Sequence, residues 1–219
     1  MRTRYAALAI VLAVASTTRQ ADAQRTPGAG LDSATSAAIA PIIEQARSAN
    51  LPLEPLYAKA REGQVQGVPA ARIEVAVRAI AGRLQTANEA LAPNASEPEL
   101  SAAADAIKHG VPAETLRLMR KAGRDGSLAV PIGVLTQLIV RGIPVEQASV
   151  KIVDLLQRGA VSNHFIALDD RVRADVLAGK RPDESLDLRM RGIIPNLPQS
   201  ATATTDAIQA TSPGNRKRP

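Results

Sequence analysis

The feature that most constrains the fold is a short junction that recurs along the chain: a small residue, an aliphatic residue, then proline. Glycine just after a helix takes the left-handed conformation that closes the last turn. Proline cannot continue a helix but suits the first position of the next one. Each junction therefore predicts the end of one helix and the start of another. The copies are Asn50-Leu51-Pro52, Gly67-Val68-Pro69, Gly110-Val111-Pro112, Ala129-Val130-Pro131 and Gly142-Ile143-Pro144.

Between the junctions, apolar residues recur at intervals of three and four, which is the period of one helix face. Ile73, Val77, Ile80 and Leu84 show this spacing, and no sustained alternation typical of strands occurs. We therefore predict an all-α domain over residues 33–195, either a compact multi-helix bundle or a short array of orthogonal helical hairpins. The predicted helices span residues 33–49, 53–62, 69–91, 97–108, 112–122, 131–141, 144–158, 162–178 and 182–191.

The N-terminus has the composition of a secretory signal peptide. A basic start is followed by an unbroken apolar run over residues 6–15, and Ala21 and Ala23 place small residues where a signal peptidase reads. The run is shorter than the roughly 20 residues that span a bilayer. We therefore predict that residues 1–23 are removed before Gln24, which leaves a periplasmic or secreted protein with no transmembrane segment in the mature chain.

Two further segments lack helical periodicity. Residues 24–32 are rich in glycine and predict a flexible linker. Residues 196–219 are rich in Ala, Thr, Ser and Pro and predict a disordered tail that ends in the basic cluster Arg216-Lys217-Arg218. Because this cluster and the basic N-terminus contribute strongly to the formal net charge of +6, no nucleic-acid partner is expected.

The composition excludes several kinds of chemistry. The chain has no Cys, which rules out disulfides, thiolate zinc sites, iron–sulfur clusters and thiol catalysis. It has no Trp, one Phe and two Tyr, too few aromatic rings for a base-stacking platform. Metal-binding spacings and phosphate-binding glycine loops do not occur. We therefore expect neither a metal nor a cofactor.

Two sets of residues keep an enzymatic alternative open. His109 precedes Gly110, where a histidine suits the negative end of a helix dipole, and His164 lies shortly before two aspartates. No Gly-x-Ser-x-Gly turn accompanies either histidine. The acidic pairs could serve as acid and base in a cell-envelope hydrolase or lyase, although carboxylates are also expected at helix starts. No catalytic residue is assigned. The pairs are Glu97/Glu99, Asp169/Asp170 and Asp183/Glu184.

A basic stripe follows the junction at Pro112. Its residues Arg117, Arg120, Lys121 and Arg124 share one helix face and are candidates for binding an anionic surface. The alternative is a solvated face in which Glu114 pairs with the cations of its own helix.

Short helices bounded by Gly-Val-Pro steps, behind a signal peptide, resemble uncharacterised exported all-helical bacterial proteins. The resemblance covers about residues 45–160 and implies no activity and no site residues. Our leading hypothesis is an exported, non-enzymatic interaction protein whose partner is another envelope protein or an anionic envelope polymer. The alternatives are the hydrolase or lyase with an Asp/Glu pair, and an anion-binding envelope stress protein.

Overall fold

The protein is all-α, as the sequence predicts. A computed structural model describes residues 30–123 and 126–197, and in this part of the chain there are nine α-helices, one short 3-10 helix and no strand. The signal-peptide prediction, with its cleavage residues Ala21, Ala23 and Gln24, lies outside the described residues. The helices are α1 (Ser33–Ser48), α2 (Glu54–Val65), α3 (Ala70–Leu91), α4 (Glu97–Lys108), α5 (Ala113–Ala122), α6 (Ala129–Val140), α7 (Val145–Gln157), α8 (Ser162–Leu177), α9 (Pro182–Ile193) and η1 (Ile194–Asn196).

Six of the helices end in the same way, with one left-handed residue. The residue after it donates its backbone N–H to a carbonyl five positions back, as Val111 does to Ala106 over 3.0 Å. This Schellman arrangement satisfies carbonyls that the helix end would leave unpaired. The same closure ends α7 and α8, where the sequence lacks the aliphatic–proline step. The left-handed residues are Asn50, Gly67, Gly110, Gly142, Gly159 and Gly179.

The junction prolines lie one residue earlier than predicted. Pro69, Pro112 and Pro144 precede their helices with extended ψ angles of 142°, 144° and 138°. This placement works because the carbonyl of such a residue still accepts the first helical bond, as Pro144 does from Ala148 at 3.0 Å.

One predicted junction is wrong. Ala129-Val130-Pro131 lies inside the first turn of α6 and does not separate two helices. Proline is tolerated there because the first N–H groups of a helix have no intrahelical partner. The helix before it, α5, ends at Ala122, and the N–H of the following residue, Gly123, donates to the carbonyl of Met119 over 2.7 Å.

The helical domain is longer than residues 33–195 at both ends. Gln64 of α2 donates to the carbonyl of Gly30 (2.9 Å) and accepts the N–H of Asp32 (2.7 Å), so the end of the predicted linker is bonded to the domain. At the other end Leu197 is buried, within the segment predicted as tail. Residues 198–219 lie outside the described part of the chain.

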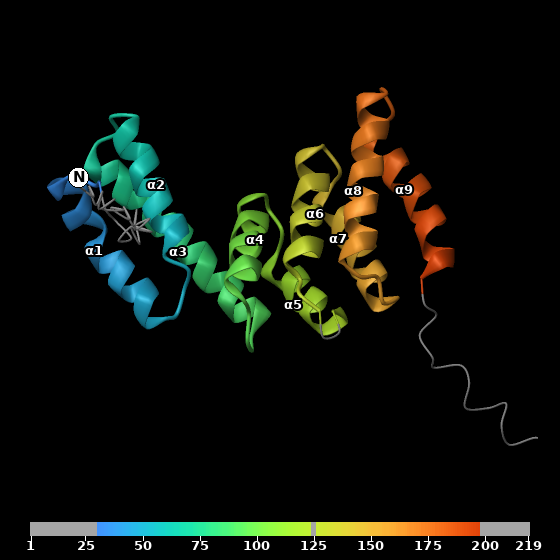
Figure 1. The fold of residues 1–219 in the computed structure, drawn as a ribbon, viewed down its shortest axis with the longest axis horizontal. Coiled ribbons are helices and arrows are strands. Elements are labelled where there is room, and N and C mark those ends of the chain that lie inside the picture. The colour runs from blue at the N-terminus through green and yellow to red at the C-terminus, as the bar shows by residue number, and fades with distance from the viewer. Residues whose placement is uncertain (1–29, 124–125, 198–219) are drawn as a thin grey trace, which may run out of the picture.

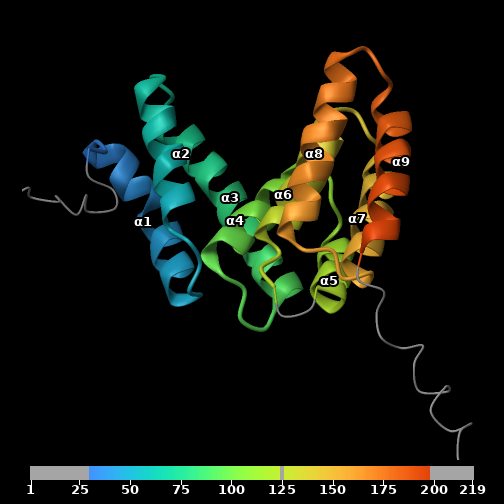
Figure 2. The same cartoon turned by 45° about the vertical axis from the view of Figure 1, so that its right-hand side comes forward.

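The helices form a stacked array in two layers. α4, α6 and α8 lie side by side in one layer, and α9 packs on α8 (Figure 1). α3, α5 and α7 pack on one another in a second layer. α1 and α2 both pack on α3, at the end of the array opposite α9 (Figure 2). Alternate helices therefore become neighbours.

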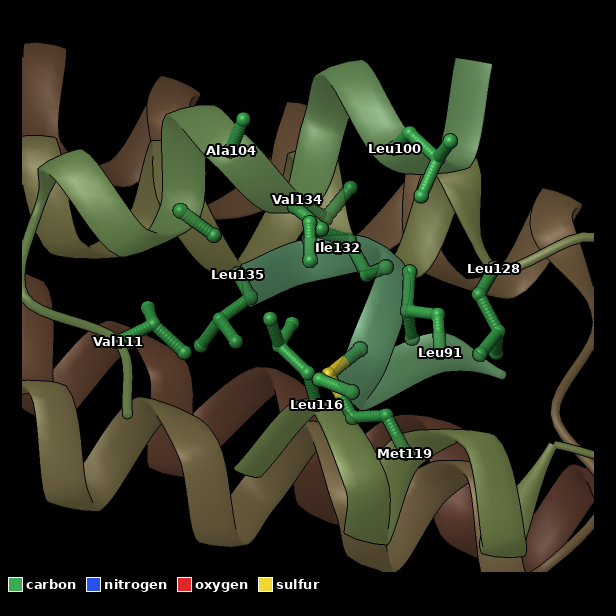
Figure 3. Close-up of a cluster of buried hydrophobic side chains, with 14 of the residues drawn as sticks. Leu91, Leu100, Ala104, Val111, Leu116, Met119, Leu128, Ile132, Val134 and Leu135 are labelled. Atoms are coloured by element: carbon green, nitrogen blue, oxygen red, sulfur yellow. The ribbon is translucent and has the colours of Figure 1, made fainter. Parts of the chain in front are cut away.

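The core runs between the two layers. In Figure 3, Leu91 from α3, Leu100 from α4 and Leu116 from α5 converge with Ile132 and Leu135 of α6. Each such side chain contributes roughly 1.5–3 kcal/mol when fully buried. The aliphatic residues of the junctions join this core: Leu51, Val111 and Ile143 are buried. The junctions thus anchor the array as well as ending helices.

Candidate functional site

Both histidines lie at helix ends. Nδ1 of His109, the residue that follows α4, is 2.9 Å from the carbonyl oxygen of Asp105, which can only accept. Nδ1 of His164 accepts the backbone N–H of Val161 over 3.1 Å at the start of α8. The two rings therefore cap different helices, and the structure does not bring them together.

The two members of the pair Glu97/Glu99 differ in burial. Glu97 is exposed, whereas Glu99 is only 4% exposed. The Glu99 carboxylate accepts the backbone N–H groups of Ser96 and Leu128, each over 2.8 Å. Burial opposes ionisation, but these bonds together with the Ser96 hydroxyl and Arg120 lower the pKa of Glu99 below its ordinary value. A general acid needs the opposite shift.

The other two acidic pairs are matched by nearby arginines. Asp169 accepts bonds from both terminal guanidinium nitrogens of Arg141, and Asp170 is 2.9 Å from Arg173. A single residue, Arg181, contacts both Asp183 and Glu184. The pairs of Arg173 and Arg181 are local to one helix end or face, whereas the Arg141 pair joins the end of α6 to α8. The arrangement offers no free carboxylate from these pairs.

The four residues of the predicted basic stripe have different environments. Arg117 is exposed and pairs with Glu114 over 3.0 Å, and Lys121 is exposed. Arg120 is partly buried: its Nε donates to the carbonyl of Leu91 over 3.0 Å, and its Nη2 is 3.3 Å from the Glu99 carboxylate. Arg124 lies outside the described residues. Only Arg117 and Lys121 are thus seen on the surface, where anion binding stays a prediction.

Sequence reasoning missed a groove between α5 and α7. It has a volume of about 800 Å³, and two of its large aliphatic side chains face solvent: Leu118 is 45% exposed and Val150 is 61% exposed. Val145 and Val153 extend the apolar lining. The Ser149 hydroxyl lines the same groove and is buried without a hydrogen-bond partner. Exposed apolar side chains beside a concave surface are typical of binding sites.

The signal for this groove is weak in the sequence. Leu118 lies off the buried face of its helix, which contains Leu116 and Met119, and Val150 lies off the face that contains Ala148 and Ile152. Isolated exposed aliphatic residues are common and carry no information alone. They become a site only because alternate helices stack, which brings α5 against α7.

Charged side chains border the groove. Glu146, Lys151 and Asp154 line it, and all three belong to α7. Lys151, on the α7 side, is 3.0 Å from Asp187 of α9, and Asp154 accepts two bonds from Arg158 over 2.8 and 2.9 Å. The groove is therefore apolar at its centre and charged at its rim.

Comparisons with known proteins give no relative: no protein-family model, no curated protein and no solved structure matches the chain. Over residues 30–123 and 126–197, no group of three or more metal-ligating side chains comes together. In the same ranges, no helix has both the length and the apolar character to cross a bilayer.

Proposed function

We propose that this is an exported, non-enzymatic interaction protein that binds a segment of another envelope protein in the groove between α5 and α7. The observation that carries the proposal is the exposure of Leu118 and Val150 on the walls of one concave surface. Apolar side chains that stay in water in the free protein gain about 25 cal/mol per Å² when a partner covers them.

The shape of the groove favours an amphipathic helix as its occupant. Two helices form its walls, of 10 and 13 residues. At about 1.5 Å per residue these walls are roughly 15 and 20 Å long, which suits a partner helix of three to four turns. The partner helix would present apolar side chains at intervals of three or four residues to Leu118 and Val150.

Charge defines the partner further. Glu146, Lys151 and Asp154 of α7 line the groove, so a partner helix would meet charges of both signs along that wall. Such pairs mainly set orientation and association rate. Arg117 and Lys121 are not among the residues that line the groove, so anion binding by the basic stripe is a separate prediction.

The carboxylates argue against the hydrolase or lyase. Each of the acidic pairs weighed from the sequence contains residues bonded to arginine, and the pKa of Glu99 is lowered. Glu146 and Asp154 line the groove but belong to the same helix, α7. A glycosidase needs one carboxyl group with a raised pKa facing a second across the substrate.

The groove is tested by the double variant Leu118→Gln plus Val150→Gln in a crosslinking experiment on the cell envelope. We expect the partner crosslinked to the wild-type protein to be lost. The matched control is Val65→Gln plus Leu177→Gln, which changes two aliphatic residues that are 87% and 83% exposed outside the groove. Equal loss in both variants, or no loss in either, would contradict the assignment of the groove.

Export is tested separately by mass spectrometry of the protein recovered from the periplasmic and extracellular fractions. We expect an N-terminus at Gln24. Recovery of the chain only in the cytoplasm and with Met1 still present would contradict the proposal of an envelope partner, whatever the groove variants show.

A further inference from the structure

A second concave surface lies between α2 and α4, away from the groove between α5 and α7. It has a volume of about 560 Å³, and α3 forms its floor. α3 has 22 residues, about 33 Å of helix, so it is long enough to pack against both α2 and α4. The pocket is the space that remains between these two helices above α3.

Small side chains keep this pocket open. Ala76 and Ala79 of α3 and Ala104 of α4 line it, with Ile80 and Leu84 beside them. Larger residues at the alanine positions would fill the space. The apolar floor can contact the body of a small organic molecule.

The walls carry more positive than negative charge. Lys59, Arg83 and Lys108 line the pocket, against the carboxylates of Glu62 and Asp105. Lys59 is 2.9 Å from Glu62. The hydrogen bond from Lys59 is the main cause that lowers the pKa of Glu62, and the charge of Lys108 contributes. Glu62 therefore stays ionised and is matched by Lys59.

This pairing leaves two cations for a ligand. Neither the Arg83 side chain nor the Lys108 side chain makes a hydrogen bond or an ion pair with another described residue. Arg83 is also partly buried, on the floor helix. The other cation on this stretch of α3 behaves differently, since Arg78 is 2.6 Å from Glu74. A partly buried guanidinium without a protein partner is a favourable donor for a carboxylate or phosphate, which it can bind with two parallel bonds.

We propose that the pocket between α2 and α4 binds a small organic anion through a carboxylate or phosphate group. Arg83 donates to the anionic oxygens, Lys108 adds a second positive charge, and the alanine floor contacts the body of the ligand. The site is independent of the groove between α5 and α7, and the proposal does not rest on the function suggested for that groove.

The test is a nuclear magnetic resonance titration of the purified protein with inorganic phosphate and, separately, with acetate. We expect saturable shifts in the amides of α2, α3 and α4 with at least one of the two anions, and the stronger of them identifies the chemical group. Arg83→Gln should weaken binding by about tenfold or more, since a hydrogen bond to a charged group is lost. Because the Arg83 side chain bonds to no other residue in the part of the chain that the structure describes, the variant should fold normally.

Two controls separate this site from general attraction of anions. Arg78→Gln, on the same helix, should leave the affinity unchanged. Arg117→Gln plus Lys121→Gln should also leave it unchanged, because those cations lie on α5. The proposal is overturned if neither anion gives saturable shifts in α2 to α4, if Arg83→Gln binds as well as the wild type, or if the control variants lose affinity equally. Repetition at two salt concentrations supports the site if binding persists at the higher one.

Discussion

Glu99 shows how one carboxylate can connect four parts of the fold. It accepts bonds from Ser96 at the start of α4 and from Leu128 before α6. Arg120 of α5 contacts the same carboxylate and donates to Leu91 at the end of α3. Its bond with Ser96 forms a capping box within one turn of α4, so this part of its role is local. The contact with Leu128 and the ion pair with Arg120 depend on the packing of helices that are distant in sequence.

We predict that Glu99→Gln destabilises the protein by about 1–3 kcal/mol, because buried donors lose a charged acceptor. Urea denaturation monitored by circular dichroism measures the change. Glu97→Gln is the matched control, since Glu97 is exposed in the same turn, and we expect it to have little effect. Similar midpoints for the two variants would mean that the Glu99 network contributes no stability.

Asp175 forms a second carboxylate network, between α8 and α9. It accepts two bonds from Arg189, each 2.7 Å, one from Lys180 at 2.8 Å and one from Ser185 at 2.7 Å. The bonds from Arg189 are the largest cause that holds the pKa of Asp175 far below its ordinary value of 3.8. The folded state therefore binds the Asp175 proton less readily than the unfolded state does.

A depressed pKa in the folded state gives stability that is present above the unfolded value and is lost as the pH falls toward the folded value. We predict that the midpoint of urea unfolding falls as the pH decreases below about 4. Asp175→Asn should lower stability at pH 7 and flatten this dependence. Asp170→Asn, which changes an exposed pair on the same helix, should retain the slope. An unchanged slope in Asp175→Asn would contradict the assignment.

At the scale of the element, glycines inside helices serve different purposes. Gly63 in α2 is buried, and a methyl group there would lie 2.7 Å from Cγ1 of Ile73 in α3. Gly82 in α3 is exposed, and no neighbouring atom lies within 4 Å of the same position. The first glycine permits close approach of two helices, while the second has only the entropic cost of a flexible residue.

We predict that Gly63→Ala and Gly82→Ala have opposite effects on thermal stability. Gly82→Ala should stabilise the protein by about 0.5–1 kcal/mol through helix propensity. Gly63→Ala should destabilise it by about 1–3 kcal/mol, because Ile73 must move out of a packed position. Calorimetry measures both, and a stabilising Gly63→Ala would show that α2 and α3 adapt freely.

The helix boundaries show what local sequence can and cannot specify. Glycine closures and first-turn carboxylates such as Glu54, Glu114 and Glu146 act within one turn, so their effects are readable from the sequence. Pro131 shows the limit. Proline is compatible both with a junction and with the first turn, and only the packing of α6 against α4 and α8 decides between them.

At the scale of the molecule, the main packing contacts of the array join helices that are one or two positions apart in chain order. α1 and α9 lie at opposite ends (Figure 1). In such an array stability is close to a sum of local units and their interfaces. The two ends can therefore unfold locally and independently, so ligand binding at one end need not change the structure at the other.

We predict that Ile39→Ala, which removes a buried side chain of α1, raises hydrogen exchange mainly in α1 to α3. The local cost is about 2–5 kcal/mol for a large-to-small change in the core. Leu186→Ala should act on α8 and α9 instead, because Leu186 is buried in α9. Exchange measured by mass spectrometry distinguishes the two patterns, and a uniform increase in either variant would show a single cooperative unit.

Neither candidate surface could be predicted in full from the sequence. The spacing of the basic residues predicts the stripe. However, tertiary contacts pair Arg120 with Glu99 and with the carbonyl of Leu91. Leu118 and Val150 lie on separate helices with α6 between them in the chain, so their shared groove depends on stacking. The same holds for Arg83 and Lys108, which meet only because α4 packs on α3.

The sequence by itself determined the helical class, the number and order of the helices in the described part of the chain, and most of their ends. These follow from interactions within one or two turns, which act wherever the helix lies. Tertiary structure alone decided that alternate helices stack, which carboxylates are neutralised, and where apolar and cationic side chains remain uncovered. Those properties depend on distances between residues that are far apart in the chain. Helical periodicity shows which face of a helix is apolar, but it does not show which other helix packs against that face.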